Sequence, residues 1–247
     1  AGFLSTASKA AGFAVLARLF LVAFPDALAA TAINWTAILA VLSAVTMTVG
    51  NLLALPQKNL KRLLAFSSIA HAGYAMIGIV AATRLGVQSV AFYMLAYIVT
   101  NLAAFGVVMA LGRITGSDEL DAYRGLSRRS PALALCMLAA FLSLAGMPPF
   151  AGFVGKVVVF AAGVQANYVW LVVVGIINSV IGVYYYLNVM KYVYLFRMEG
   201  NDEDKHPIAL PRPYALALVV LSVAIIVVGT VFAPWFSQAD LAAATLF

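Results

Sequence analysis

Charged residues are scarce in this sequence. Only 10% of its 247 residues are Asp, Glu, Lys or Arg, and nine of these are acidic. Soluble domains carry about 25% charged and about 45–50% apolar residues, whereas 64% of this chain is hydrophobic. Repeated apolar runs of about 20 residues are typical of helices that cross a membrane. The composition therefore excludes a soluble domain and predicts an all-α, polytopic membrane protein.

Residue types that build metal, nucleotide and redox sites are also scarce. The single cysteine, Cys136, lies in an apolar run and is typical of a small core residue. The sequence has no Cys/His cluster, no glycine-rich phosphate loop and no paired carboxylates. We therefore expect no redox centre, metal or cofactor in this chain. Its net charge of +6 is attributed to loops that set membrane topology rather than to nucleic-acid binding.

Apolar runs predict seven membrane-spanning helices, over residues 3–24, 33–55, 60–83, 87–111, 131–165, 168–195 and 213–236. As a continuous helix the fifth run would be about 52 Å long, too long for one crossing of a hydrocarbon core about 30 Å thick. Pro148 and Pro149 interrupt it, flanked by Gly146 and Gly152, which tolerate unusual backbone dihedrals. We expect one crossing whose helix is broken near Pro148-Pro149, with the irregular backbone buried or lining a hydrated cavity.

Basic residues alternate between the predicted loops and so predict the topology. With seven spans, three loops on one side carry ten basic residues, and the opposite loops carry only Arg84. By the positive-inside rule the basic side is cytoplasmic. The ten residues are Lys58, Lys61, Arg62, Arg113, Arg124, Arg128, Arg129, Arg197, Lys205 and Arg212.

Two lysines, Lys9 and Lys156, lie well inside apolar runs, while all nine acidic residues fall outside the predicted spans. An ammonium in mid-bilayer without a counter-charge costs at least about 2.5–3.5 kcal/mol, and burial opposes its charged form. A lysine balanced in this way can take up and release a proton, so both are predicted to transfer protons. The alternative is a lysine that reaches the membrane interface or pairs with another subunit.

His71 lies within the third predicted span. Ser67, His71 and Tyr74 are spaced i, i+4 and i+7 and therefore share one helix face. Histidine can relay protons at physiological pH, so His71 is a possible relay. A buried histidine hydrogen-bonded to a serine or a backbone carbonyl is the alternative.

Five stretches of the sequence are distinctive as a set: "FLSTASKAAGFAVLARLF" (3–20), "GNLLALPQKNLKRLLAFSSIAHAGY" (50–74), "YRGLSRRSPALA" (123–134), "LSLAGMPPFAGFVGKVVVF" (142–160) and "INSVIGVYYYLNVMKYVYL" (177–195). They resemble the antiporter-like membrane subunits of respiratory complex I, and among these the N-type subunit of the bacterial enzyme.

The resemblance implies that this chain is the C-terminal half of a fourteen-helix protein with two inverted five-helix repeats. Residues 1–24 would be the family's eighth helix, 25–195 the second repeat with its broken helix at 131–165, 196–212 a charged cytoplasmic loop, and 213–247 the final helix and tail. The lysine of the broken helix matches Lys156, and the eighth-helix lysine matches Lys9. The other lysine of the family's proton path and its glutamate partner would lie in the N-terminal half, which a separate chain could supply.

The implied function is a proton-translocating membrane-arm subunit of NADH:quinone oxidoreductase in the bacterial inner membrane. Flavin, iron–sulfur clusters and quinone would then belong to partner subunits, and neighbouring antiporter-like subunits and lipid would surround this one. Two alternatives are a subunit of a multisubunit sodium/proton antiporter and a structural half-subunit without a proton path of its own.

Overall fold

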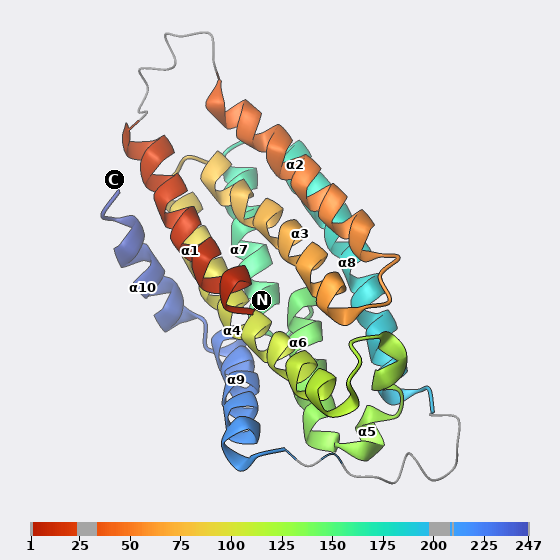
Figure 1. The fold of residues 1–247 in the computed structure, drawn as a ribbon. Coiled ribbons are helices and arrows are strands. Elements are labelled where there is room, and N and C mark those ends of the chain that lie inside the picture. Colours follow the sequence, from red (N-terminus) through yellow and green to blue (C-terminus); the bar gives the residue numbers. More distant parts are fainter. Residues whose placement is uncertain (1, 24–33, 198–207, 209, 247) are drawn as a thin grey trace.

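The computed structural model describes residues 2–23, 34–197, 208 and 210–246, and all regular elements in these ranges are helices (Figure 1). Five of the described helices are long and apolar enough to cross a membrane. They are α2 (Trp35–Ala54), α3 (Leu60–Val80), α4 (Arg84–Thr115), α8 (Val169–Tyr194) and α9 (Arg212–Thr230). The prediction of an all-α, multi-pass membrane protein is confirmed.

Shorter helices make up the remaining predicted spans. α1 (Gly2–Arg18) continues as a π-helical turn, η1 (Leu19–Ala23), and the long fifth run forms α6 (Pro131–Ala145) and α7 (Ala151–Gln165). The predicted helix break within 131–165 is thus confirmed, while the count of seven crossings and the two-repeat organisation stay predictions.

The last predicted span, 213–236, is wrong at its C-terminal bound. α9 ends at Thr230, and a separate helix, α10 (Ala233–Ala243), begins three residues later. Pro234 stands in the first turn of α10, where a proline loses no helical hydrogen bond because that N–H has no partner inside the helix. Apolar composition continues across this junction, so hydropathy alone could not reveal it.

Polar side chains fix where several helices begin. Asn34, Asn59 and Thr83 each accept a hydrogen bond from a backbone N–H in the first turn of α2, α3 and α4, which satisfies a donor that lacks a partner inside the helix. α4 ends at Thr115 and is followed by Gly116, whose positive φ of 70° is typical of a glycine that terminates a helix.

The basic loops meet at one end of the bundle, next to the short helices η3 (Leu120–Tyr123) and α5 (Leu126–Arg129), at the bottom of Figure 1. Lys61 pairs with Asp118 at 2.8 Å, and the N–H of Gly125 donates to the carbonyl of Phe196 at 3.0 Å. The loops after α2, α4 and α8 are therefore in contact, as the alternation of charge predicts; Lys205 lies outside the described residues.

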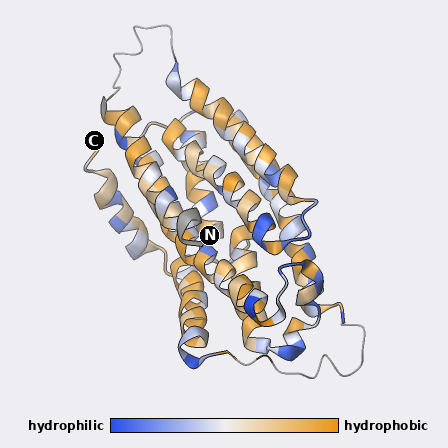
Figure 2. Ribbon diagram, viewed as in Figure 1, coloured by the Kyte–Doolittle hydropathy of each residue, from blue (hydrophilic) through white to orange (hydrophobic). Residues whose placement is uncertain are grey.

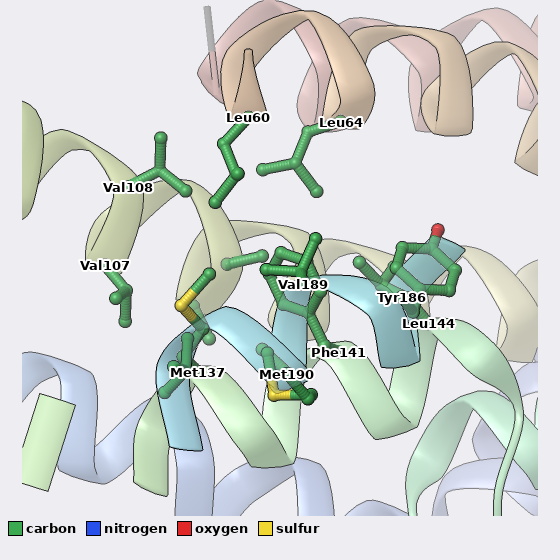
Figure 3. Close-up of a cluster of buried hydrophobic side chains, with 14 of the residues drawn as sticks. Leu60, Leu64, Val107, Val108, Met137, Phe141, Leu144, Tyr186, Val189 and Met190 are labelled. Atoms are coloured by element: carbon green, nitrogen blue, oxygen red, sulfur yellow. The ribbon is translucent and has the colours of Figure 1, made fainter. Parts of the chain in front are cut away.

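Apolar side chains pack the interior and also cover the outside of the bundle. Figure 3 shows Tyr186 and Val189 of α8 against Phe141 and Leu144 of α6, with Leu64 of α3 facing them. Hydrophobic residues also cover the outward faces of the helices, as Figure 2 shows. An apolar exterior of this kind suits helices surrounded by lipid.

Candidate functional site

The break between α6 and α7 leaves two backbone carbonyls without their usual partners. In a continuous helix the carbonyls of Leu144 and Ala145 would accept from the N–H groups of residues 148 and 149. Both of those residues are proline and have no N–H. The chain turns instead at Gly146, whose φ is 82°, and α7 begins at Ala151.

Lys156 occupies the place of the missing donors. Its Nζ donates to the carbonyl of Leu144 at 3.1 Å, to the carbonyl of Ala145 at 3.0 Å and to the hydroxyl of Ser179 on α8 at 2.9 Å. The residue is 5% exposed. Its ammonium also lies 5.1 Å from the centre of the Tyr74 ring, within the range of a cation–π contact.

These partners suit a lysine that changes its charge. An ammonium has three donors and no acceptor, and it would use all three here. A neutral amine has two donors and one lone pair, so it could keep both carbonyls and accept from Ser179, because a hydroxyl can donate or accept. The two protonation states can therefore share one geometry, with only the Ser179 hydroxyl reversing its role.

Two glycines hold this geometry for different reasons. A Cβ on Gly146 would lie 2.8 Å from Cδ of Lys156, and the positive φ is itself unfavourable for other residues. Gly152 lies within α7 and has no unusual dihedral, so that part of the sequence prediction is wrong. It is small because α7 passes close to α6: a Cβ there would lie 1.9 Å from the carbonyl oxygen of Ser143.

Lys9 is half-buried on α1 and reaches across to α3. Its Nζ donates to the backbone carbonyl and the hydroxyl of Ser68. The ammonium also lies 5.8 Å from the centre of the Tyr97 ring on α4. Lys9 therefore contacts α3 and α4, while Lys156 contacts α3, α6 and α8, so α3 is the helix that both lysines reach.

His71 is buried between these two positions. Its Nδ1 shares a hydrogen bond with the Tyr93 hydroxyl at 2.6 Å, and its Nε2 shares one with the Tyr186 hydroxyl at 3.3 Å. The ring lies 5.0 Å from that of Tyr97 and 5.7 Å from that of Tyr74, between centres. Since Lys9 contacts the first of these rings and Lys156 the second, the three predicted residues belong to one buried cluster.

A small cavity joins His71 to the helix break. Its volume is about 10 Å³, and His71, Tyr97, Thr100, Ser143 and Leu144 are among the residues that line it. A buried water needs roughly 10–15 Å³ and two to four polar partners. The cavity is close to that size, but its wall is almost entirely apolar, because the hydroxyls of Thr100 and Ser143 bond each other and offer a water few partners.

Several polar residues of the cluster were not singled out by the sequence. Tyr93 and Tyr186 bind both nitrogens of His71, and Tyr185 donates to Asn51 at 2.9 Å. Asn51 in turn donates to the Tyr74 hydroxyl at 3.0 Å. A tyrosine inside a membrane span must find a partner for its hydroxyl, but the sequence does not show which one.

In the described part of the chain, no carboxylate pairs with Lys9 or Lys156. The carboxylates that the structure describes lie at the ends of the bundle: Asp118 bonds Lys61, Asp121 bonds Arg124, Asp240 bonds Arg84, and Glu119 accepts from Asn59. Backbone carbonyls, hydroxyls and ring faces are therefore the groups that face Lys9 and Lys156.

Comparison with known proteins places this geometry in a family. The transmembrane family described as NADH:quinone oxidoreductase/Mrp antiporter matches residues 1–182. The chain is 44% identical over 246 residues to NADH-quinone oxidoreductase subunit N of Heliobacterium modesticaldum, covering 100% of this chain and 51% of that protein. For subunit N of Moorella thermoacetica the identity is 44% over 247 residues, with 100% and 50% covered. The chain thus spans about half the length of the curated relatives it matches.

Two solved structures share the fold of this chain. A chain of respiratory complex I from Thermus thermophilus is 36% identical with a TM-score of 0.77, covering 96% of this chain and 50% of that one. A chain of the Mrp complex from a Dietzia species has a TM-score of 0.84 at 21% identity, covering 96% and 51%. The second likeness shows a shared fold alone.

Proposed function

Because the chain belongs to the NADH:quinone oxidoreductase/Mrp antiporter transmembrane family, we propose that it is a proton-translocating membrane-arm subunit of a bacterial NADH:quinone oxidoreductase. Quinone reduction in partner subunits would drive protons through buried lysines of this chain. The single observation that carries the proposal is the set of partners around Lys156, two carbonyls and one hydroxyl, which fits both charge states of a lysine.

Proton transfer would run from Lys9 through His71 to Lys156. Each nitrogen of His71 faces a tyrosine hydroxyl, and a hydroxyl can accept a proton on one side while it donates another. The small cavity that His71 and Leu144 both line would be the route from the imidazole to the helix break. Lys156 would take the proton as a neutral amine and hold it as an ammonium on the carbonyls of α6.

The surroundings follow from the same proposal. Flavin, iron–sulfur clusters and quinone would be held by partner subunits, and neighbouring antiporter-like subunits would flank this one in the bacterial inner membrane. The end with the basic loops would face the cytoplasm. The half of the relatives' length that this chain does not span would supply the other proton-path residues, as part of the same protein or as a separate chain.

Two alternative functions can be distinguished from this one by experiment. A subunit of a sodium/proton antiporter would exchange sodium for protons without quinone reduction. Four relatives at 44% identity are NADH-quinone oxidoreductase N subunits, which favours the redox-driven function. A structural half-subunit would need neither lysine.

The test replaces Lys9 or Lys156 by Ala in the assembled complex and measures proton pumping and quinone reduction in membrane vesicles. Lys191, an exposed lysine on α8, is the matched control as Lys191→Ala. We expect the Lys9 and Lys156 variants to assemble on a native gel and to lose most pumping, while the control keeps it. Full pumping by Lys156→Ala would leave only a structural role, and sodium transport without redox activity would favour the antiporter.

A further inference from the structure

The ring of Tyr74 lies between the imidazole of His71 and the ammonium of Lys156. Nζ of Lys156 lies 5.1 Å from the centre of this ring. His71 meets the same ring in a T-shaped contact with ring centres 5.7 Å apart, and Phe160, one turn after Lys156 on α7, meets it in another at 6.3 Å. Because Tyr74 is only 2% exposed, water does not weaken the attraction between its ring face and the ammonium.

The hydroxyl of Tyr74 is held by the buried side-chain amide of Asn51 on α2. The amide nitrogen donates to this hydroxyl at 3.0 Å and to the backbone carbonyl of Met47 at 2.9 Å, and it lies 3.2 Å from Oδ1 of Asn178. The amide oxygen accepts from the hydroxyl of Tyr185 at 2.9 Å. Both ends of the amide are thus bonded, and a buried polar network whose groups are all paired is rigid. Asn51 therefore fixes where the Tyr74 hydroxyl lies and which way its ring faces.

The same turn of α8 carries a partner of Asn51 and a partner of Lys156. Asn178 bonds the Asn51 amide, and the next residue, Ser179, accepts from Nζ of Lys156 at 2.9 Å. Asn178 is itself fixed, because its amide nitrogen donates to the carbonyl of Val174, one turn earlier, at 3.0 Å. The ring and the hydroxyl that face the ammonium are therefore placed by one bonded network across α2, α3 and α8.

Among the described groups that face Lys156, Tyr74 is the one that favours a single charge state. The two carbonyls and Ser179 can serve an ammonium or a neutral amine, whereas the negative face of an aromatic ring attracts a cation. This attraction is weaker than that of a carboxylate, which would form a full ion pair in a buried site. A ring can therefore help to hold a proton on the lysine without preventing its release.

We propose that the Tyr74 ring stabilises the ammonium form of Lys156 in place of a carboxylate, and that Asn51 is the residue that positions this ring. The inference rests on the proposed function, because it requires Lys156 to change its charge during turnover. Asn51 does not touch the transferred proton and acts through Tyr74 alone.

The test measures how proton pumping by the assembled complex in membrane vesicles depends on pH. Tyr74→Phe is made with ordinary phenylalanine and with phenylalanine that carries one, two or three ring fluorines. Fluorine draws electron density from the ring face and changes its shape little, so a purely structural role would not follow the number of fluorines. The matched control is the same fluorinated series at Phe92, which is 0% exposed and packs against Phe236 at 5.9 Å.

We expect the pH above which pumping falls to move down with each fluorine at position 74, by about one unit over the series, or about ten-fold in proton binding. The direction follows because a weaker ring face favours the neutral amine, so the ammonium is lost at a lower pH. The other titratable groups around Tyr74 in the described residues, His71 on α3, Tyr93 on α4 and Tyr185 on α8, are the same throughout the series. An unchanged profile at position 74, or an equal shift at Phe92, overturns the proposal.

A second comparison tests Asn51 as a positioning residue. Asn51→Leu frees the ring to move, and we expect it to shift the pH profile in the same direction as the fluorines do. Added to Tyr74→Leu, which removes the ring, it should cause no further shift, since two residues that act through one contact are not additive. A further shift of similar size contradicts the role of Asn51. Because the fluorinated rings keep the native shape, the first comparison decides the role of Tyr74 even where Asn51→Leu lowers assembly on a native gel.

Failure of this proposal differs from failure of the proposed function. Normal pumping by Lys156→Ala would contradict the proposed function itself. Loss of pumping in Lys156→Ala, together with a pH profile that does not respond to fluorine at position 74, would leave that function in place and overturn the role of Tyr74 alone.

Discussion

The position of the Lys156 ammonium depends on three residues that lack an ordinary backbone or side-chain group. Pro148 and Pro149 have no N–H, so the carbonyls of Leu144 and Ala145 remain open to the lysine. Gly146 has no Cβ, so the lysine chain can pass beside it. These three absences create a binding site for one ammonium in a region without a described carboxylate.

Gly146 gives the sharpest prediction at this scale. In Gly146→Ala the methyl group would lie 2.8 Å from Cδ of Lys156 at a φ of 82°, and a strained backbone of this kind costs about 1–3 kcal/mol. We expect a lower thermal unfolding temperature of the complex and weaker pumping, because the lysine must move off its carbonyls. The control is Gly12→Ala, where no atom lies within 4 Å of the new Cβ. Equal stability and pumping in the two variants would contradict this reading of Gly146.

Lys9, Lys156 and His71 could be singled out from the sequence because charge and imidazole are rare inside apolar runs, and the structure brings the three together. Their partners could not, since each partner comes from a different helix. Tyr186 reaches His71 across 115 positions of sequence and Ser68 reaches Lys9 across 59. Such contacts depend on how helices pack, and hydropathy carries no information on that.

At the scale of elements, the broken helix is held in place from two sides. Gly152 brings α7 against Ser143 of α6, and its N–H donates to the Ser143 hydroxyl at 3.0 Å. On the other side, the end of α9 presses on the turn itself: a Cβ on Gly229 would lie 2.2 Å from the carbonyl oxygen of Pro149. The break is therefore a packed structural feature, and α9 ends close to where it lies.

Restoring the N–H groups at the break tests whether the free carbonyls matter. In Pro148→Ala with Pro149→Ala, the new N–H groups can bond Leu144 and Ala145 and compete with Lys156. Each proline in a helix interior costs about 3 kcal/mol relative to alanine, so the continuous helix becomes more favourable. We expect the complex to assemble and proton pumping in vesicles to fall.

Pro56→Ala is the control for this pair, because Pro56 is an exposed proline between α2 and α3. Gly152 must remain glycine in all variants, since a Cβ there would lie 1.9 Å from the Ser143 carbonyl oxygen. Wild-type pumping by the double variant would show that the lysine does not need these carbonyls.

In the molecule as a whole, the described charged residues lie in distinct zones along the length of the bundle. Basic loops gather at one end, the Arg84–Asp240 pair marks the other, and the lysine cluster lies between them. Hydropathy and loop charge predicted this arrangement because both follow directly from the membrane. They did not predict the separate α10, since Val231 and Phe232 at the junction are as apolar as the helices they join.

The central claim is that Lys156 carries a proton by changing its charge while its partners stay in place. The direct measurement is the number of protons translocated per quinone reduced, in liposomes that contain the assembled complex with Lys156→Arg. A guanidinium keeps the positive charge but does not release its proton in proteins. The account predicts that Lys156→Arg loses pumping while the control Lys191→Arg pumps as the wild type does. Normal pumping by Lys156→Arg would show that a fixed charge is sufficient and would contradict the account.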